Sequence, residues 1–198
     1  MADWTITANS NPSPYSAGAN TPLIRYYQES TAASTAVIKN GDIVSFDTVT
    51  SSNNFRIVRA PFNGGTTSAT TPVANLLNTT NVVGIAVEAS TSDGSTTGLA
   101  NPRVRLIGVA VAEPNADFTG YLNGDTAVAQ GFSSHIGQAK AVRYDSTNHV
   151  YTIDSTNSTA ALASIVITGI QENFLGDTNA PVIFKFLSTG VSPVVRSL

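Results

Sequence analysis

The feature that most constrains the fold of this chain is a set of short strand-like segments that occurs twice in the same order. Each set holds an Asn-Gly-Asp turn, a Gly-Ile strand and a proline-led strand. These segments lie at residues 40–42, 83–88 and 102–106, and again at 123–125, 168–172 and 181–186. The similar spacing of the two sets predicts two related halves that share one β scaffold.

From residue 37 onward, β-branched and aromatic residues form short runs separated by turn residues. Many short strands at this spacing are typical of a sandwich or a barrel. We therefore expect an all-β fold, a compact barrel or sandwich with two quasi-repeated halves, preceded by an extended N-terminal arm. The expected body is one domain, 37–198, with a pseudo-repeat at about 37–112 and 121–188.

The counterpart of Ile43–Phe46 in the second half stays open between two segments. Residues 123–125 match the turn that precedes this strand, whereas Val142-Arg143-Tyr144-Asp145 matches the strand itself and the hairpin that follows. The repeated glycines fall at turns and at strand positions where a side chain would meet a neighbouring strand. We expect structural roles for four of them, Gly41, Gly84, Gly124 and Gly169.

Residues 1–36 differ from the body because they combine prolines with many Ser, Thr, Asn and Ala residues. Proline favours an extended backbone and removes a donor, and polar spacers offer little to bury. This composition fits either a disordered tail or an arm that becomes ordered against a partner. The isolated large residues favour docking against a partner protein or a neighbouring subunit, through Trp4, Tyr15, Leu23, Ile24, Arg25, Tyr26 and Tyr27.

The charge balance excludes some partners. Charged residues make up 12% of the chain, the formal net charge is −3 and the pI is near 5.2. Binding to phosphate backbones needs clustered Lys and Arg, so we expect no nucleic-acid ligand. Soluble monomers usually carry a denser mixture of surface charge, so this surface suits a chain that is covered by protein partners.

The chain has no cysteine, which excludes disulfides and thiolate metal sites. The sequence at the N-terminus lacks the basic and apolar regions of a signal peptide, and the apolar runs are too short to span a bilayer. We therefore expect no membrane partner and a protein that is made in a cytosol.

No pattern of residues indicates catalysis. The two histidines, His135 and His149, have no neighbour at the spacing of a metal site or a catalytic triad. No nucleophile elbow, phosphate loop or zinc-protease helix occurs. The acids occur in matched pairs, Asp42 with Asp125 and Glu88 with Glu172, which suggests duplicated structural roles. We expect a protein that is not an enzyme, with no catalytic, cofactor-binding or metal-binding residues.

Four segments together resemble the decoration (cement) proteins of tailed-bacteriophage capsids. These segments are Gly41–Val44, Val83–Ala89, Arg105–Ala110 and Asn123–Asp125, and the resemblance covers about residues 37–187. The chain departs from the smallest members in its N-terminal arm and in the 61–81 loop. The resemblance implies a non-enzymatic β protein, usually a homotrimer, that binds the major capsid protein and bridges capsomers. It also implies a place on the outer surface of the virion, with assembly in the host cytoplasm.

The alternative is a phage fibre or a carbohydrate- or receptor-binding β module. Such a module would share the composition rich in Ser, Thr and Asn. It would occur at few copies on a particle and would bind glycans in isolation. A cement protein would occur at many copies and would bind the shell.

Overall fold

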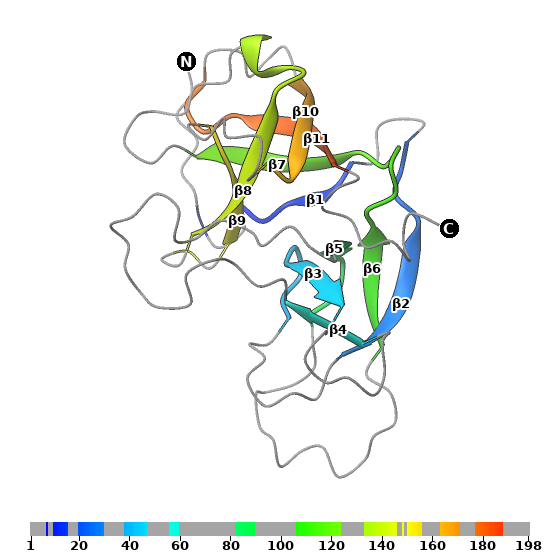
Figure 1. The fold of residues 1–198 in the computed structure, drawn as a ribbon. Helices are drawn as coiled ribbons and strands as arrows, with labels where there is room; N and C mark the ends of the chain where they lie inside the picture. The colour runs from blue at the N-terminus through cyan, green and yellow to red at the C-terminus, as the bar shows by residue number, and fades with distance from the viewer. Residues whose placement is uncertain are drawn as a thin grey trace.

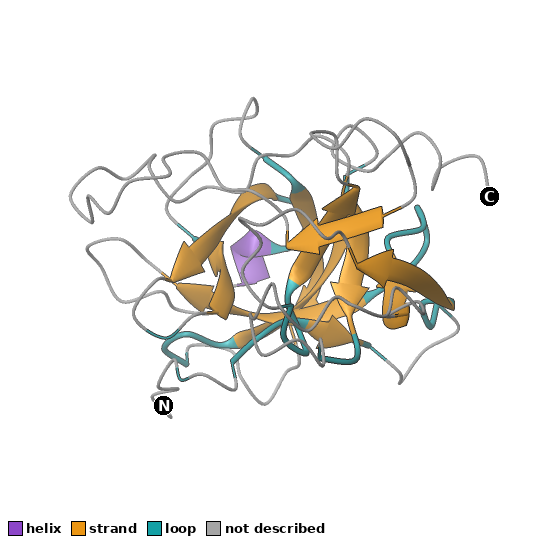
Figure 2. Cartoon of the chain, turned by 90° about the horizontal axis from the view of Figure 1, so that it is seen from below, coloured by secondary structure: helices purple, strands orange, loops and turns teal. Residues whose placement is uncertain are grey.

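The computed structural model is a β protein whose strands form a closed five-stranded barrel and a six-stranded sheet, one above the other in Figure 1. Pairings join five strands of that sheet into a ring, which we call the second barrel. Figure 2 shows strands as the dominant element, with one short helical element among them. That element is the 3-10 helix η2, Ser133–His135. The structure describes residues 7, 10–15, 20–29, 38–46, 56–59, 82–89, 106–123, 133–145, 148, 150–155, 163–170 and 177–187. In these ranges, no helix is long and apolar enough to cross a membrane.

The first barrel is built from five short strands in the order β2-β4-β3-β5-β6, and it is closed. Four of its pairings are antiparallel, and the pairing of β2 with β4 is parallel. Its strands are β2 (Ile24–Glu29), β3 (Ile43–Phe46), β4 (Arg56–Arg59), β5 (Val82–Ala86) and β6 (Leu106–Val111).

The second group is a six-stranded sheet in the order β1-β7-β11-β10-β8-β9, in which β9 also pairs with β7. That extra pairing joins five strands into a ring and leaves β1 outside it, against β7. The strands are β1 (Ser13–Pro14), β7 (Phe118–Asn123), β8 (Ala139–Asp145), β9 (Val150–Asp154), β10 (Ile165–Ile170) and β11 (Pro181–Phe186).

The two rings have the same topology. Each strand from β2 to β6 has the same neighbours, in the same directions, as the strand five places later in the chain. The parallel β2–β4 pairing corresponds to the parallel β7–β9 pairing, and every other pairing is antiparallel in both rings. The expected all-β fold with two related halves is thereby confirmed. By this topology, β8 corresponds to β3, so residues 142–145 belong to the counterpart of Ile43–Phe46.

The structure differs from the sequence-based expectation in where the arm ends. Residues 24–29, which we expected to lie in the arm, form β2 and pair with β6 and β4 inside the first barrel. Ser13 and Pro14 form β1 and pair with Thr119 and Phe118 of the second barrel. The polar, proline-rich sequence around these strands suggested an arm. No local pattern predicts the strands, because their partners lie far along the chain. The first barrel therefore begins at residue 24, not 37.

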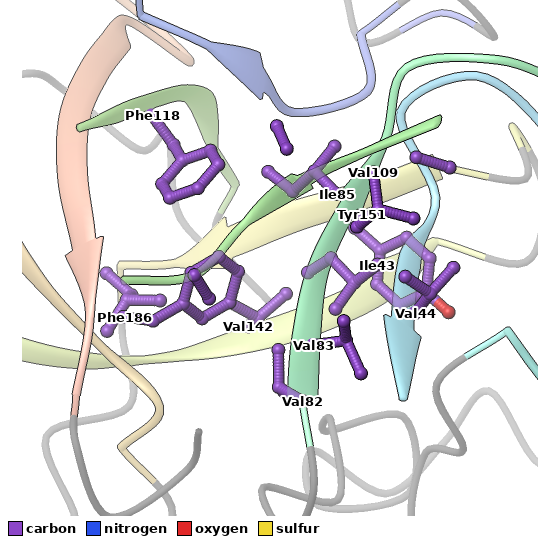
Figure 3. Close-up of a cluster of buried hydrophobic side chains, with 14 of the residues drawn as sticks. Ile43, Val44, Val82, Val83, Ile85, Val109, Phe118, Val142, Tyr151 and Phe186 are labelled. Carbon is purple, nitrogen blue, oxygen red and sulfur yellow. The ribbon is translucent and has the colours of Figure 1, made fainter. Parts of the chain in front are cut away.

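One buried apolar cluster extends through both barrels, and Figure 3 shows its centre. The first barrel contributes mainly aliphatic side chains together with Phe46. The second adds three mutually contacting phenylalanines, Phe118, Phe184 and Phe186, with ring centroids 5.3–5.8 Å apart. Fully burying such a side chain stabilises a fold by about 1.5–3 kcal/mol relative to leaving it exposed. The two barrels therefore share one core.

The four glycines expected to be structural differ in how tightly they are packed. Gly41 has φ of +87°, and a Cβ there would overlap the side chain of Asn11. A Cβ on Gly84 would overlap the backbone carbonyl oxygen of Ala110 in β6. At Gly169 the nearest atom to an added Cβ is Ile183 Cδ1 at 3.5 Å, an ordinary contact. Gly124 lies outside the described residues.

Gly84 and Gly169 are also not matched in register. Both glycines follow a shift in register, but Gly84 lies opposite Val111, the last residue of β6, whereas Gly169 lies opposite Ile183, the third residue of β11. The expectation that both glycines avoid the same collision therefore holds for Gly84 and is wrong for Gly169. The backbone carbonyl that blocks a side chain at Gly84 has no counterpart near Gly169.

We predict that Gly84→Ala lowers the free energy of unfolding by about 1–3 kcal/mol, because the carbonyl of Ala110 cannot rotate away as a side chain can. Gly169→Ala, the matched control, should change it by less than about 0.5 kcal/mol. Urea denaturation followed by circular dichroism measures both. Equal losses at the two positions would contradict this account.

Asn11 joins the two barrels through its side-chain amide. Its Oδ1 accepts the N–H of Tyr151 in β9 at 3.1 Å, and its Nδ2 donates to the carbonyl of Asn40 at 3.3 Å. Asn40 belongs to the turn before β3, and Tyr151 is fully buried. One side chain of the N-terminal segment therefore holds the first barrel against the second.

Asn11→Ala should destabilise the fold by about 1–3 kcal/mol, because it removes the acceptor of a buried N–H. Asn40→Ala is the control, since Asn40 contributes its backbone carbonyl to this contact and the substitution keeps that carbonyl. Thermal unfolding of both variants, followed by circular dichroism, tests the difference. If the two variants melt together, Asn11 does not join the barrels.

Candidate docking surface

Large apolar side chains are exposed mainly at one place on the described surface. Leu23, Ile24, Tyr26 and Leu106 are 47–59% exposed, and all four lie on or beside β2 and β6. Ile136, which follows η2, is the other described large apolar residue with comparable exposure. We call Leu23, Ile24, Tyr26 and Leu106 the docking surface.

The alternation of side chains along β2 explains why this surface forms. Side chains of a strand point to opposite faces in turn, so Ile24, Tyr26 and Gln28 share the outer face. Tyr27 points the other way and packs against the core, where its ring meets Phe46 edge-on with centroids 5.8 Å apart. The barrel interior is thus filled by one half of β2, and the apolar residues of the other half remain outside.

The neighbouring strand β6 forms the other part of the surface. Tyr26 lies opposite Gly108 of β6, and Gln28 lies opposite Leu106. Gly108 has no side chain, and the side chains of Val87 and Glu88 lie over the position that its Cβ would take. Side chains diagonal to one another across a strand pair lie within reach, so Tyr26 and Leu106 form one apolar patch.

Glu88 supports this part of β6. Strand β5 ends at Ala86, and the N–H of Val87 donates to the carbonyl of Gly108 at 2.9 Å. The carboxylate of Glu88 then accepts the N–H of Gly108 at 3.1 Å, in place of a further strand residue. Glu88 therefore has the structural role that we expected. Its counterpart Glu172 lies outside the described residues.

The charges near the docking surface are few and of both signs. Burial raises the pKa of the Tyr27 phenol, Arg25 lowers it and Glu113 raises it further. One cation and one carboxylate therefore act on the inner side of β2. A patch with apolar side chains and no dominant charge suits an uncharged protein surface as its partner.

The residues expected to contact a partner differ in how exposed they are. Leu23, Ile24 and Tyr26 are exposed, whereas Arg25, Tyr27 and Tyr15 are half-buried. The N–H of Tyr15 donates to the carbonyl of Asp117 at 3.0 Å, so its backbone is fixed to the second barrel. Trp4 lies outside the described residues. Leu106 was missed, because only the register between β2 and β6 places it beside Tyr26.

The titratable side chains that could serve in catalysis or metal binding make structural contacts instead. Asp42 accepts the N–H of Lys39 at 2.8 Å within the turn before β3. His135 belongs to η2, and burial, with a smaller effect of Lys140, lowers its pKa. Burial also lowers the pKa of Lys140, whose ammonium donates to the carbonyl of Ser155 at 2.8 Å. His149 lies outside the described residues. Across the described ranges, no three His, Asp or Glu side chains are grouped to hold a metal ion.

A concave region lies between the two barrels. This cavity of about 330 Å³ is lined by Asn11, Pro12, Ser13, Asn40, Gly41, Thr119, Gly120, Tyr121 and Pro181. None of these side chains is charged. The lining offers amide and hydroxyl groups beside a tyrosine and two prolines, which is a surface that an uncharged polar molecule could contact.

No protein-family model, no curated protein and no solved structure matches this chain. Its assignment therefore rests on its own residues and geometry.

Proposed function

We propose that this chain is a structural virion protein that decorates a bacteriophage capsid and stabilises it by bridging neighbouring capsomers of the major capsid protein. It acts as a homotrimer on the outer surface of the virion, after assembly in the host cytoplasm, and it has no catalytic role. The proposal rests on the resemblance carried by Gly41–Val44, Val83–Ala89, Arg105–Ala110 and Asn123–Asp125.

The observation that most supports a binding role is the docking surface. Ile24, Tyr26 and Leu106 together expose on the order of 300 Å² on the outer face, comparable with the largest apolar patch of a typical monomer. Contiguous apolar patches on soluble proteins usually mark interaction sites. The patch lies on a closed barrel, so its strands are held by backbone pairing on both sides of β6.

The low charge of the chain fits this role. With charged residues at 12%, the surface has few groups that would oppose close contact with other subunits. A decoration subunit repeated over a capsid adds many modest contacts, and multivalency turns them into strong overall attachment. The shared core of the two barrels would transmit load across the subunit without exposing new strand edges.

The alternative is a phage fibre or carbohydrate-binding module, and the cavity between the barrels favours it. Its uncharged lining with Tyr121, Asn11 and Asn40 is of the kind that contacts sugar hydroxyls and ring faces. Copy number on purified particles separates the two functions. Protein abundance comparable with the major capsid protein supports decoration, whereas a few copies per particle, together with glycan binding in solution, supports the alternative.

Tyr26→Lys should weaken attachment to expanded capsid shells by about tenfold or more, because interface aromatic residues often carry much of the binding energy. Ile136→Lys is the matched control, since Ile136 has similar exposure but follows η2 in the second barrel. Both variants should melt at the wild-type temperature, as both side chains are exposed. Occupancy of shells after mild heating, measured by gel densitometry, gives the comparison.

Equal occupancy for Tyr26→Lys and wild type would show that the docking surface does not contribute to attachment. Failure of the wild-type protein to bind shells at all would contradict the proposed function itself.

A further inference from the structure

The cavity between the barrels has walls from three parts of the chain. Residues 11–13 of the N-terminal segment form one wall, the turn at residues 40–41 forms another, and residues 119–121 of β7 with Pro181 of β11 form the third. In Figure 1, β1 lies between β7 and the first barrel. The cavity therefore exists only where the N-terminal segment brings the two barrels together.

The alternation of side chains along β7 turns two of them toward the cavity. A Cβ on Gly120 would meet Phe184 Cε1 at 3.1 Å and Ile153 Cδ1 at 3.3 Å, so Gly120 faces the core of the second barrel. Its neighbours on the strand face the opposite way. Thr119 and Tyr121, both half-buried, therefore present their side chains to the cavity.

The polar groups of the lining are held in fixed positions. Ser13 Oγ and Thr119 Oγ1 lie 2.9 Å apart and share a hydrogen bond. The Asn11 amide is fixed at both ends, by the N–H of Tyr151 and by the carbonyl of Asn40. Each hydroxyl oxygen, the amide oxygen and the amide nitrogen can take part in more hydrogen bonds than these. The lining thus offers preorganised donors and acceptors, which lowers the cost of binding a ligand.

Apolar ring surfaces lie beside these polar groups. Pro181 lies opposite Tyr121 in the pairing of β7 with β11, and Pro12 belongs to the same wall as Asn11. A tyrosine presents an aromatic face with a hydroxyl at its end, and a proline ring presents C–H groups. A sugar ring has the complementary surface, because its hydroxyls surround its edge and its C–H groups cover its faces.

The size and the charge of the lining narrow the class of ligand. A volume of about 330 Å³ is near the lower end of the range for small-molecule sites, which is about 300–1,000 Å³. None of the nine lining side chains is charged, so a charged ligand would leave water without an opposite charge from the lining. Polar cavities normally hold water, and hydroxyl groups that reproduce the hydrogen bonds of that water can replace it. A single neutral ring with several hydroxyls meets all these conditions.

We infer that this cavity binds one neutral pyranose ring, either free or at the end of a glycan. The face of the sugar ring packs against Tyr121 and Pro181. Its hydroxyls form hydrogen bonds with Ser13, Thr119 and Asn11. The inference goes beyond the proposed function, because bridging capsomers requires no small ligand.

Titration of the isotope-labelled full chain with sugars, followed by amide chemical shifts in NMR spectra, tests the inference. The neutral probes are methyl α-glucoside, methyl α-rhamnoside and N-acetylglucosamine. At least one should shift amides at residues 11–13, 40–41 and 119–121, with a dissociation constant on the order of 1–10 mM, as expected for so small a ligand. Glucuronic acid and glucosamine, which are charged sugars of similar size, should bind several-fold more weakly. Tighter binding of maltotriose than of methyl α-glucoside would assign the site to a glycan, and equal binding would assign it to a single ring.

Two variants test the contacts themselves. Tyr121→Ala removes the aromatic face, and Thr119→Val removes a hydroxyl but keeps the shape of the side chain. Each should weaken sugar binding by roughly three- to tenfold, the value of one contact of this kind. Tyr26→Ala is the matched control, because Tyr26 is an exposed tyrosine that does not line the cavity. Thermal unfolding by circular dichroism shows which variants are folded, and Thr119→Val alone suffices if Tyr121→Ala is not.

Three results would overturn the inference. The first is no shift at the cavity with any neutral probe at about 100 mM, well above the expected dissociation constants. The second is equal binding of charged and neutral sugars. The third is sugar binding that the folded cavity variants leave unchanged, which places the sugar elsewhere.

These outcomes are separable from the fate of the proposed function. Sugar binding by a chain that does not attach to shells keeps the cavity site and removes the capsid role. Attachment to shells without sugar binding keeps the capsid role and removes the cavity site. Sugar binding by a chain with many copies per particle adds a ligand to the decoration role.

Discussion

Each barrel depends on one short parallel pairing for its closure. In the first barrel, β2 meets β4 at two residue pairs, and in the second, β7 meets β9 at two residue pairs. Without these pairings the antiparallel strands would form open sheets with unpaired backbone groups at both ends, which costs free energy wherever water is excluded. Closure also encloses the inner faces on which the shared apolar core is built. Two of the shortest ladders in the fold thus close its two rings.

The sequence predicted the β class, the duplication and the order of most strands, because turns and apolar runs are local signals. It failed where a strand is defined by a distant partner. Ile24–Glu29 alternates as a strand does, but its partner β6 lies near residue 110, and the surrounding prolines suggested an arm. The matching of Gly84 with Gly169 failed for a related reason. Each glycine follows a shift in register, but Gly84 lies opposite Val111 in β6 and Gly169 lies opposite Ile183 in β11, and identity of residues across a repeat does not reveal which neighbour a glycine meets.

The docking surface was only partly predictable, because one part of it is a local sequence signal and another part depends on a distant strand. Leu23, Ile24 and Tyr26 are conspicuous as large residues among polar ones, so composition alone drew attention to them. Leu106 joins them only through the pairing of β2 with β6, which no local pattern contains. The two related barrels are not identical beside β7 and β2. Within the described residues, the N-terminal segment pairs with β7 through β1 and no such segment pairs with β2, so the two related barrels do not present the same surface.

The position of β1 has a consequence for the order of folding during synthesis. Ser13 and Pro14 leave the ribosome well before their partners Thr119 and Phe118, which emerge only after the whole first barrel. The hydrogen bond of Asn11 can form only later still, because Tyr151 lies 140 residues further along the chain. Contacts so distant in sequence form late and slowly. The segment that holds Asn11 and β1 is therefore among the last parts to be fixed, and the first barrel must fold while this segment is still unpaired.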